Sequence, residues 1–342
     1  MNSFDGMNPS PFRRNAGGRL SKLLRATHGF SVRSSARFFA GLGALLLLPC
    51  TTPAARAQSW LYPWTLADLS PLLHEQRPAG PRFLPSTQFW GEAGLYTAGR
   101  DVNHRWEVAI GGAVEALGAE QWSVYFESSV LLAVDPNNNV AFNPRAFFWN
   151  EGLFVAWRSG AAVWTAGLRQ LCKHDVDNVE LEHETGVEQQ RSIIDGGVLA
   201  RWERDAFETS GIALRPLLEA AVTLSTEDQR FPAGTRSIGP SVDAFLGALR
   251  GRLTADAALS SATRGGLTVD VRGTLLGQSP GKRFSAVRSL RVEPALEGFV
   301  AFPGDAASIR VFARYAAMAD DFISTPPRSA TLVALGLRIV PK

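Results

Sequence analysis

Long apolar runs are nearly lacking from this 342-residue sequence. The apolar run 38–48 spans 11 residues, and no later stretch approaches the roughly 18 consecutive apolar residues that a membrane-spanning helix requires. The sequence therefore argues against a helical membrane protein.

Cysteine and lysine are also scarce. The two cysteines are Cys50 and Cys172, and after residue 57 the only lysines are Lys173, Lys282 and Lys342. The remaining bases are arginines, which suit paired and partly desolvated charge better than lysines do. Without Cys50, Cys172 has no partner for an internal disulfide.

The first 57 residues are predicted to be a targeting segment. Lysine and arginine residues precede the apolar run 38–48, and Ala55 and Ala57 supply the small residues that signal peptidase requires at positions −3 and −1. We therefore expect export and cleavage before Gln58. Lipoprotein processing at Cys50 is an alternative, which the preceding Pro49 disfavours.

Removal of this leader reverses the sign of the net charge. The leader holds eight of the 35 Lys and Arg residues but one of the 32 Asp and Glu residues, so the rest of the chain has four more acids than bases. The pI of about 9.1 belongs to the precursor. It therefore gives no support to nucleic-acid binding, and we expect no nucleic-acid partner.

Alternation at period two is the informative pattern after the leader. Between 105 and 117, Trp106, Val108 and Ile110 share one face, while Glu107 and Glu115 share the other. The pattern recurs in about twelve segments, although it slips in the fourth and the eighth. These predicted strands are 86–98, 105–117, 121–134, 144–158, 161–173, 191–203, 212–224, 241–260, 267–276, 287–302, 308–318 and 329–340.

The connections between these segments alternate in length. Short turns rich in glycine are predicted at 118–120, 159–160, 209–211, 264–266 and 303–305. Longer polar loops are predicted at 135–143, 174–190, 227–236, 277–285 and 319–328. Outer-membrane barrels place short turns in the periplasm and long loops outside. We therefore predict an all-β fold, an antiparallel transmembrane β-barrel of about 12 strands over 86–342, preceded by a periplasmic segment 58–85.

Tryptophans fit the same fold. All nine lie at or before Trp202. Several fall near predicted strand ends, where an interfacial girdle is expected: Trp90, Trp106, Trp122, Trp164 and Trp202.

The strand pattern resembles that of bacterial outer-membrane β-barrels over essentially the whole chain after residue 57. The stretch 69–73, followed by Arg77, Pro78 and 81–83, also looks distantly like an N-terminal segment of an uncharacterised family of envelope proteins, which implies no activity. The class resemblance implies outer-membrane lipid as surroundings and the barrel-assembly machinery as a partner. The chain departs from it by ending in 339–342 (IVPK) where many such barrels end in Phe or Trp.

Charged residues recur on one face of the predicted strands and are the first candidate functional set. Charges removed from bulk water must be paired or hydrated. The set would either form a polar channel that attracts small anionic solutes or close the pore with ion pairs. Its predicted lumen-lining members are Arg105, Glu107, Glu115, Glu127, Arg169, Asp195, Arg201, Glu203, Arg215, Glu219, Asp270, Arg272, Arg291, Glu293, Glu297, Arg310 and Arg314.

A loop after the fifth predicted strand is the second candidate. Asp175, Asp177, Asn178 and Glu180 offer oxygen ligands for Ca²⁺, and His174 beside Asp175 offers a catalytic base. Outer-membrane phospholipase A is a Ca²⁺-dependent barrel enzyme with twelve strands, but its His-x-Ser arrangement is missing here because Val176 stands two residues after His174. The alternative is a solvated acidic surface loop.

Three functions remain open from the sequence. The leading hypothesis is an outer-membrane barrel without a cofactor that serves as a narrow passive channel or a structural envelope protein. The first alternative is a Ca²⁺-dependent lipid hydrolase that uses the His174 loop. The second alternative is an exported soluble β-sandwich that binds a ligand, because period-two alternation does not distinguish lipid from a protein core.

Overall fold

The structure is a computed structural model. The structure describes residues 80–98, 106–134, 144–175, 190–231, 237–238, 245–277, 287–318 and 330–341. Within these residues, no helix is long and apolar enough to cross a membrane.

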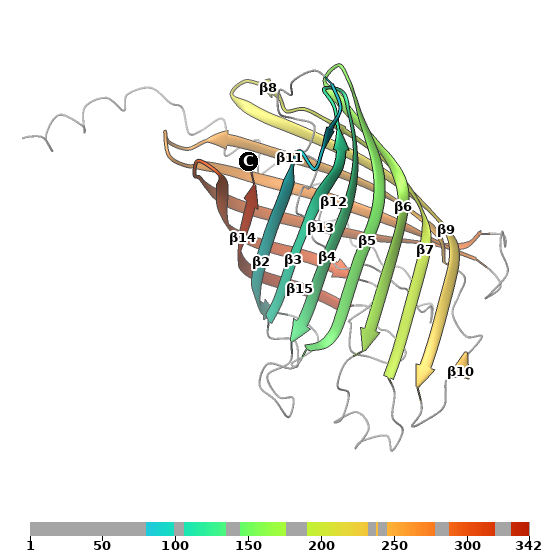
Figure 1. Ribbon diagram of the computed structural model, residues 1–342. Coiled ribbons are helices and arrows are strands. Elements are labelled where there is room, and N and C mark those ends of the chain that lie inside the picture. The colour runs from blue at the N-terminus through green and yellow to red at the C-terminus, as the bar shows by residue number, and fades with distance from the viewer. Residues whose placement is uncertain are drawn as a thin grey trace, which may run out of the picture. The chain divides into compact units, whose positions relative to one another are not determined.

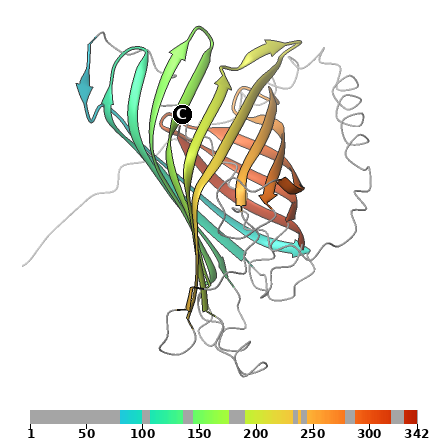
Figure 2. The same cartoon turned by 90° about the vertical axis from the view of Figure 1, so that its right-hand side faces the viewer.

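Twelve long antiparallel strands form a closed barrel (Figures 1 and 2). Each strand pairs with its neighbour in the chain, β15 pairs with β2, and the β3–β4 pairing completes the ring. The strands are β2 (Thr87–Ala98), β3 (Trp106–Gly118), β4 (Trp122–Val134), β5 (Pro144–Ser159), β6 (Ala162–Asp175), β7 (Gln190–Arg204), β9 (Ile212–Phe231), β11 (Phe245–Ala258), β12 (Arg264–Gly277), β13 (Val287–Pro303), β14 (Ala307–Met318) and β15 (Ala330–Pro341). The predicted all-β barrel of about twelve strands is confirmed.

Three short strands extend this barrel at its ends. β1 (Arg82–Phe83) pairs with β3, and both β8 (Phe207–Thr209) and β10 (Ser237–Ile238) pair with β9. Of the predicted segment 58–85, only 80–85 lies among the described residues.

Short turns gather at one end of the barrel, which we call the short-turn end, and the longer connections leave the opposite, long-loop end. Four of the predicted turns close as expected: Ala119 N–H donates to Trp122 O at 2.8 Å, Gly160 adopts a φ of 59°, Gly211 adopts a φ of 79° between the paired Thr209 and Ile212, and Gly304 N–H donates to Ala307 O at 2.8 Å. The positive φ of Gly160 costs little because glycine has no Cβ.

Two predicted connections are wrong. The turn expected at 264–266 lies instead at 259–263, where Leu259 N–H donates to Thr263 O at 2.9 Å. Gly266 belongs to β12, and a Cβ there would lie 2.3 Å from the Phe299 ring, so this glycine makes room for a neighbouring aromatic side chain. The loop expected at 227–236 begins later, because β9 continues to Phe231.

The outward face is apolar and carries a row of tryptophans at the short-turn end. Trp122, Trp157, Trp164 and Trp202 are successive cross-strand neighbours on β4 to β7. The Trp157 and Trp164 rings stack, with centroids 6.4 Å apart. Trp90 does not belong to such a girdle, because it is buried on the inward face of β2.

Candidate functional site

The inward face of the barrel carries the charged residues of the first candidate set. Successive side chains of a strand point to opposite faces of the sheet. The charged residues and their cross-strand partners are buried or half-buried, whereas the residues that alternate with them along each strand are largely exposed. The charged residues therefore lie on the inward face. Arg105 lies outside the described residues. The inward set comprises Glu107, Glu115, Glu127, Arg169, Asp195, Arg201, Glu203, Arg215, Glu219, Asp270, Arg272, Arg291, Glu293, Glu297, Arg310 and Arg314.

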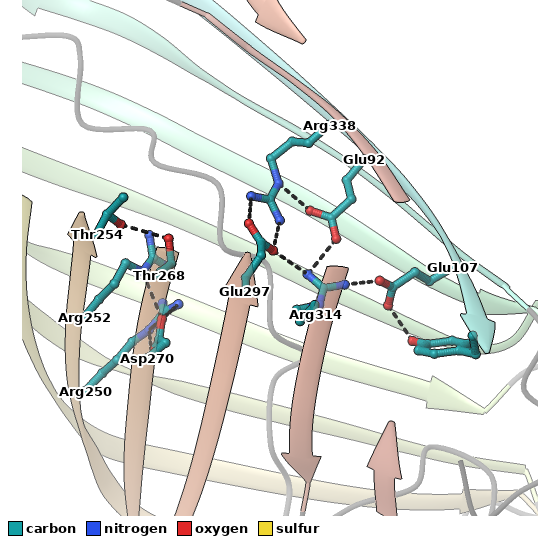
Figure 3. A network of polar contacts seen from close by, with 11 residues as sticks. Glu92, Glu107, Arg250, Arg252, Thr254, Thr268, Asp270, Glu297, Arg314 and Arg338 are labelled. Atoms are coloured by element: carbon teal, nitrogen blue, oxygen red, sulfur yellow. Dashed lines mark hydrogen bonds and ion pairs between the residues drawn. The ribbon is translucent and has the colours of Figure 1, made fainter. Parts of the chain in front are cut away.

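Two arginines hold three glutamates in the network of Figure 3. Arg338 donates through Nε to Glu92 at 2.6 Å and through both terminal nitrogens to Glu297 at 2.7 Å. Arg314 lies 2.7 Å from Glu92, 3.8 Å from Glu297 and in contact with Glu107. We call these five residues the Arg314-Arg338 network.

This network crosses several strands. Arg314 stands on β14 and Glu107 on β3, with β15 and β2 between them in the sheet. Three strand spacings measure about 14 Å along the wall. Direct contact over that separation requires the wall to curve tightly, so that these side chains meet inside the barrel.

Phe312 lies between the two arginines of this network. Its ring centroid is 5.0 Å from the Arg314 guanidinium carbon and 4.9 Å from that of Arg338. A Cβ on Gly336, the cross-strand partner of Phe312, would come within 2.4 Å of the ring. Glycine at 336 therefore lets the ring lie against the wall, where it faces both cations.

A second group joins β11 and β12. Arg250 donates to Asp270 through Nε and Nη2, at 2.9 and 2.7 Å, and Arg252 donates to the same carboxylate at 2.9 Å. The adjacent hydroxyls of Thr254 and Thr268 lie 3.1 Å apart (Figure 3). Asp270 is therefore held by two arginines, and Arg250 also interacts electrostatically with Glu219 of β9.

A third group surrounds Arg201 on β7. Its Nη2 lies 2.9 Å from Glu219, and it lies 3.7 Å from Glu203 and 3.9 Å from Glu127. Glu127 stands on β4, so this arginine reaches across β5 and β6. Arg169 of β6 stands 4.0 Å from Asp195 in the same region.

Asp256 marks the short-turn end of the inner wall. Arg215 and Arg264 both contact this buried carboxylate, and their side chains stay 39% and 36% exposed. This group thus holds one acid and two bases.

An apolar cluster fills the inner side of β3 to β7. It consists of Ala113, Tyr125, Phe154, Ala156, Val163 and Leu199. The Tyr125 and Phe154 ring centroids lie 5.5 Å apart. This part of the lumen is packed as a protein core is packed.

Charged inward residues show how closely the interior is filled. Arg338 is 1% exposed, and Glu297 and Asp270 are 0% exposed. A charged side chain that lined a water-filled channel would stay exposed to the water. The inner wall around these residues is therefore covered.

The His174 loop is only partly described. His174 shares the face of Cys172 near the long-loop end of β6, and its ring lies 6.1 Å from that of Phe147. Asp175 ends β6, whereas Asp177, Asn178 and Glu180 lie outside the described residues. No metal-holding group of His, Cys, Asp or Glu occurs in the part of the chain that the structure describes. The Ca²⁺ site and the hydrolase remain predictions.

Several network residues were missed from the sequence. The main ones are Glu92, Arg250, Arg252, Asp256 and Arg338. Arg250 and Arg252 fall in the segment 241–260, whose alternation slips. Glu92 shares its face with the apolar Trp90, which concealed the polar face. Arg338 could have been found from the sequence, because it lies an even number of residues from the inward-facing residues of the last strand.

Comparison with known proteins gives similarity in fold only. No family model and no curated protein matches the chain. The translocator domain of autotransporter NalP from Neisseria meningitidis is 11% identical, with 74% of this chain and 86% of that chain covered and a TM-score of 0.35. LpxR from Salmonella typhimurium is 6% identical, with 75% and 100% covered and a TM-score of 0.40.

The Pseudomonas putida toluene transporter TodX is 7% identical, with 75% of this chain and 88% of that chain covered and a TM-score of 0.34. These structural neighbours are bacterial outer-membrane β-barrels. Identities and scores this low carry no argument about function.

Proposed function

We propose that this chain is an outer-membrane β-barrel that serves as a structural envelope protein, with a lumen closed by its own inward side chains. The observation that carries the proposal is the burial of the inner wall, in which even the charged side chains of Arg338, Glu297 and Asp270 are covered. An open diffusion channel requires an inner wall that water reaches.

The outward face supports the membrane location. Large apolar side chains stay exposed there on strands all around the barrel, for example Phe89, Leu168, Leu249, Leu290 and Leu337. A soluble protein rarely exposes a contiguous apolar surface larger than a few hundred Å². The tryptophan row at the short-turn end fits an interfacial girdle. Outer-membrane lipid is therefore the proposed surroundings, reached through the barrel-assembly machinery.

The ion pairs support the closed lumen. The Arg314-Arg338 network and the Arg201 group each link strands that are three positions apart in the ring. Removing one partner of a buried pair costs several kcal/mol, because the other charge is left unpaired. Each group of ion pairs therefore holds strands three positions apart together and opposes the formation of a water-filled path between them.

Passage of small anionic solutes is the second candidate. It is favoured by the half-exposed Arg215 and Arg264 at the short-turn mouth. This function requires the interior to open between that mouth and the long-loop end.

Two measurements test the proposal. Outer-membrane fractionation, with gel mobility compared before and after heating, should give a heat-modifiable band in the outer-membrane fraction. Liposomes that contain the purified protein should then swell no faster in a sugar solution than empty liposomes do. A protein found only in the soluble periplasmic fraction would contradict the membrane location, and rapid swelling would favour the channel.

A further inference from the structure

Three polar residues interrupt the apolar outward face. Ser128 on β4, Glu151 on β5 and Gln170 on β6 are direct cross-strand neighbours, and we call them the polar row. Along β5, Glu151 lies between Trp149 and Leu153, both of which are outward and exposed. The polar row is therefore set into the surface that the proposed function places against lipid.

The height of the polar row puts it inside the apolar band. Trp157 belongs to the tryptophan row at the short-turn end, and Trp149 lies eight residues away toward the long-loop end of the same strand. At about 3.3 Å per residue and a tilt near 40°, the two rings lie about 20 Å apart along the barrel axis. Glu151 falls between them, two residues from Trp149.

Two members of the polar row have partners among the described residues of the barrel, and the third, Glu151, has none there. Trp149 Nε1 donates to Ser128 Oγ at 3.1 Å, and Gln170 Nε2 donates to Cys172 Sγ at 3.6 Å. Within the described residues, the structure gives the Glu151 carboxylate no hydrogen bond or ion pair. Ionisable groups on the lipid side of a barrel are destabilising, so a partner for this carboxylate would stabilise the protein.

We infer that the polar row is a contact surface for a second copy of this chain, an inference that rests on the proposed membrane location. A two-fold axis along the membrane normal, placed between β5 and β6, brings each Glu151 opposite Gln170 of the other copy. The free N–H of each carboxamide then donates to the carboxylate of the other copy. The row is thus complementary to itself.

The charge of Glu151 also argues against a phosphorylated lipid, which is the main alternative occupant of the polar row. A carboxylate repels the anionic groups of phosphorylated lipids. The stretches of β4 to β6 at this level, 126–130, 149–153 and 168–172, hold one basic residue, Arg169, and its side chain faces inward. The surface therefore offers an acceptor for an amide and no cationic partner for a phosphate.

Cross-linking through Cys172 tests the contact. Cys172 lies two residues beyond Gln170 on the same face, so the two copies of it would stand close to the axis. In a Cys50→Ser chain reconstituted in dilute phospholipid bilayers, a short bismaleimide should give a covalent dimer. If the chain stays monomeric and its gel band still shifts on heating, the contact between copies is wrong and the membrane location stands. A band that does not shift on heating would overturn the membrane location and the contact together.

An exchange of side chains tests the pairing itself. Gln170→Glu places carboxylates opposite each other and should weaken dimerisation about tenfold, as read from energy transfer between copies labelled at the N-terminus. Adding Glu151→Gln restores the carboxylate-amide pairs and should restore the dimer. Leu337→Ala, an outward change on β15, is the matched control and should leave it unchanged. Equal dimerisation in all these variants would overturn the inference.

Discussion

Two clusters in different parts of the inner wall fill the same lumen with opposite chemistry. On β3 to β7, Tyr125, Phe154 and Leu199 pack as an apolar cluster. On β13 to β15 with β2 and β3, the Arg314-Arg338 network occupies the equivalent position. Both parts present the same apolar outward face. The apolar character of the outward face thus follows from its surroundings. The interior can be filled by either apolar or charged side chains.

Removal of Arg338 should be the strongest way to break the charged part. Arg338→Met leaves Glu92 and Glu297 with a single arginine between them, and it should lower the free energy of unfolding by about 3–5 kcal/mol. Urea unfolding in lipid vesicles, followed by tryptophan fluorescence, measures the change. Adding Glu297→Gln should recover part of the loss, and a loss below about 1 kcal/mol would contradict the role of the network.

Truncation of Phe154 breaks the apolar part. Phe154→Ala leaves a cavity beside Tyr125 and should cost about 3 kcal/mol in the same measurement. Phe154→Leu is the matched control, which should cost less than about 1.5 kcal/mol because it keeps most of the volume. Equal effects of both substitutions would mean that packing does not stabilise this part.

The threonine pair sharpens the comparison, because it tests whether a polar contact can be replaced by an apolar one. Thr254→Val alone leaves the buried Thr268 hydroxyl without this partner and should cost about 1–2 kcal/mol. The double variant with Thr268→Val should be close to neutral, since both polar groups are removed. A double variant as unstable as the single one would show that the hydroxyls have other essential contacts.

Arg215 should give the smallest effect. Its side chain is 39% exposed, and Asp256 keeps its contact with Arg264 when Arg215 is removed. Arg215→Ala is therefore expected to cost no more than about 1 kcal/mol. A loss as large as that of Arg338→Met would mean that the mouth of the barrel is as tightly coupled as its centre.

The same comparison explains how far the sequence predicted the fold. All twelve long strands were predicted, because a lipid-type outward face produces period two wherever the inward face is polar. The alternation slipped over 144–158 because Phe148, Phe154 and Ala156 face inward and are as apolar as their outward neighbours. Strand position was still recognisable there from the flanking turns.

The remaining errors have local causes. Gly265 and Gly266 look like a turn in the sequence, but a glycine in a strand also serves where an aromatic ring approaches, and only the structure shows Phe299 there. The ion pairs were not predictable, because they depend on register and on curvature. Arg314 and Glu107 are 207 positions apart in the chain and three strands apart in the sheet.

Conductance in planar lipid bilayers tests the closed lumen most directly. Purified protein that has been shown to be heat-modifiable is inserted into a bilayer, and the ionic current is recorded under an applied voltage. The closed interior predicts no stable open steps for the unmodified chain. Long-lived ohmic steps of porin size would contradict the account, because such currents require a continuous water-filled path past the Arg314-Arg338 network.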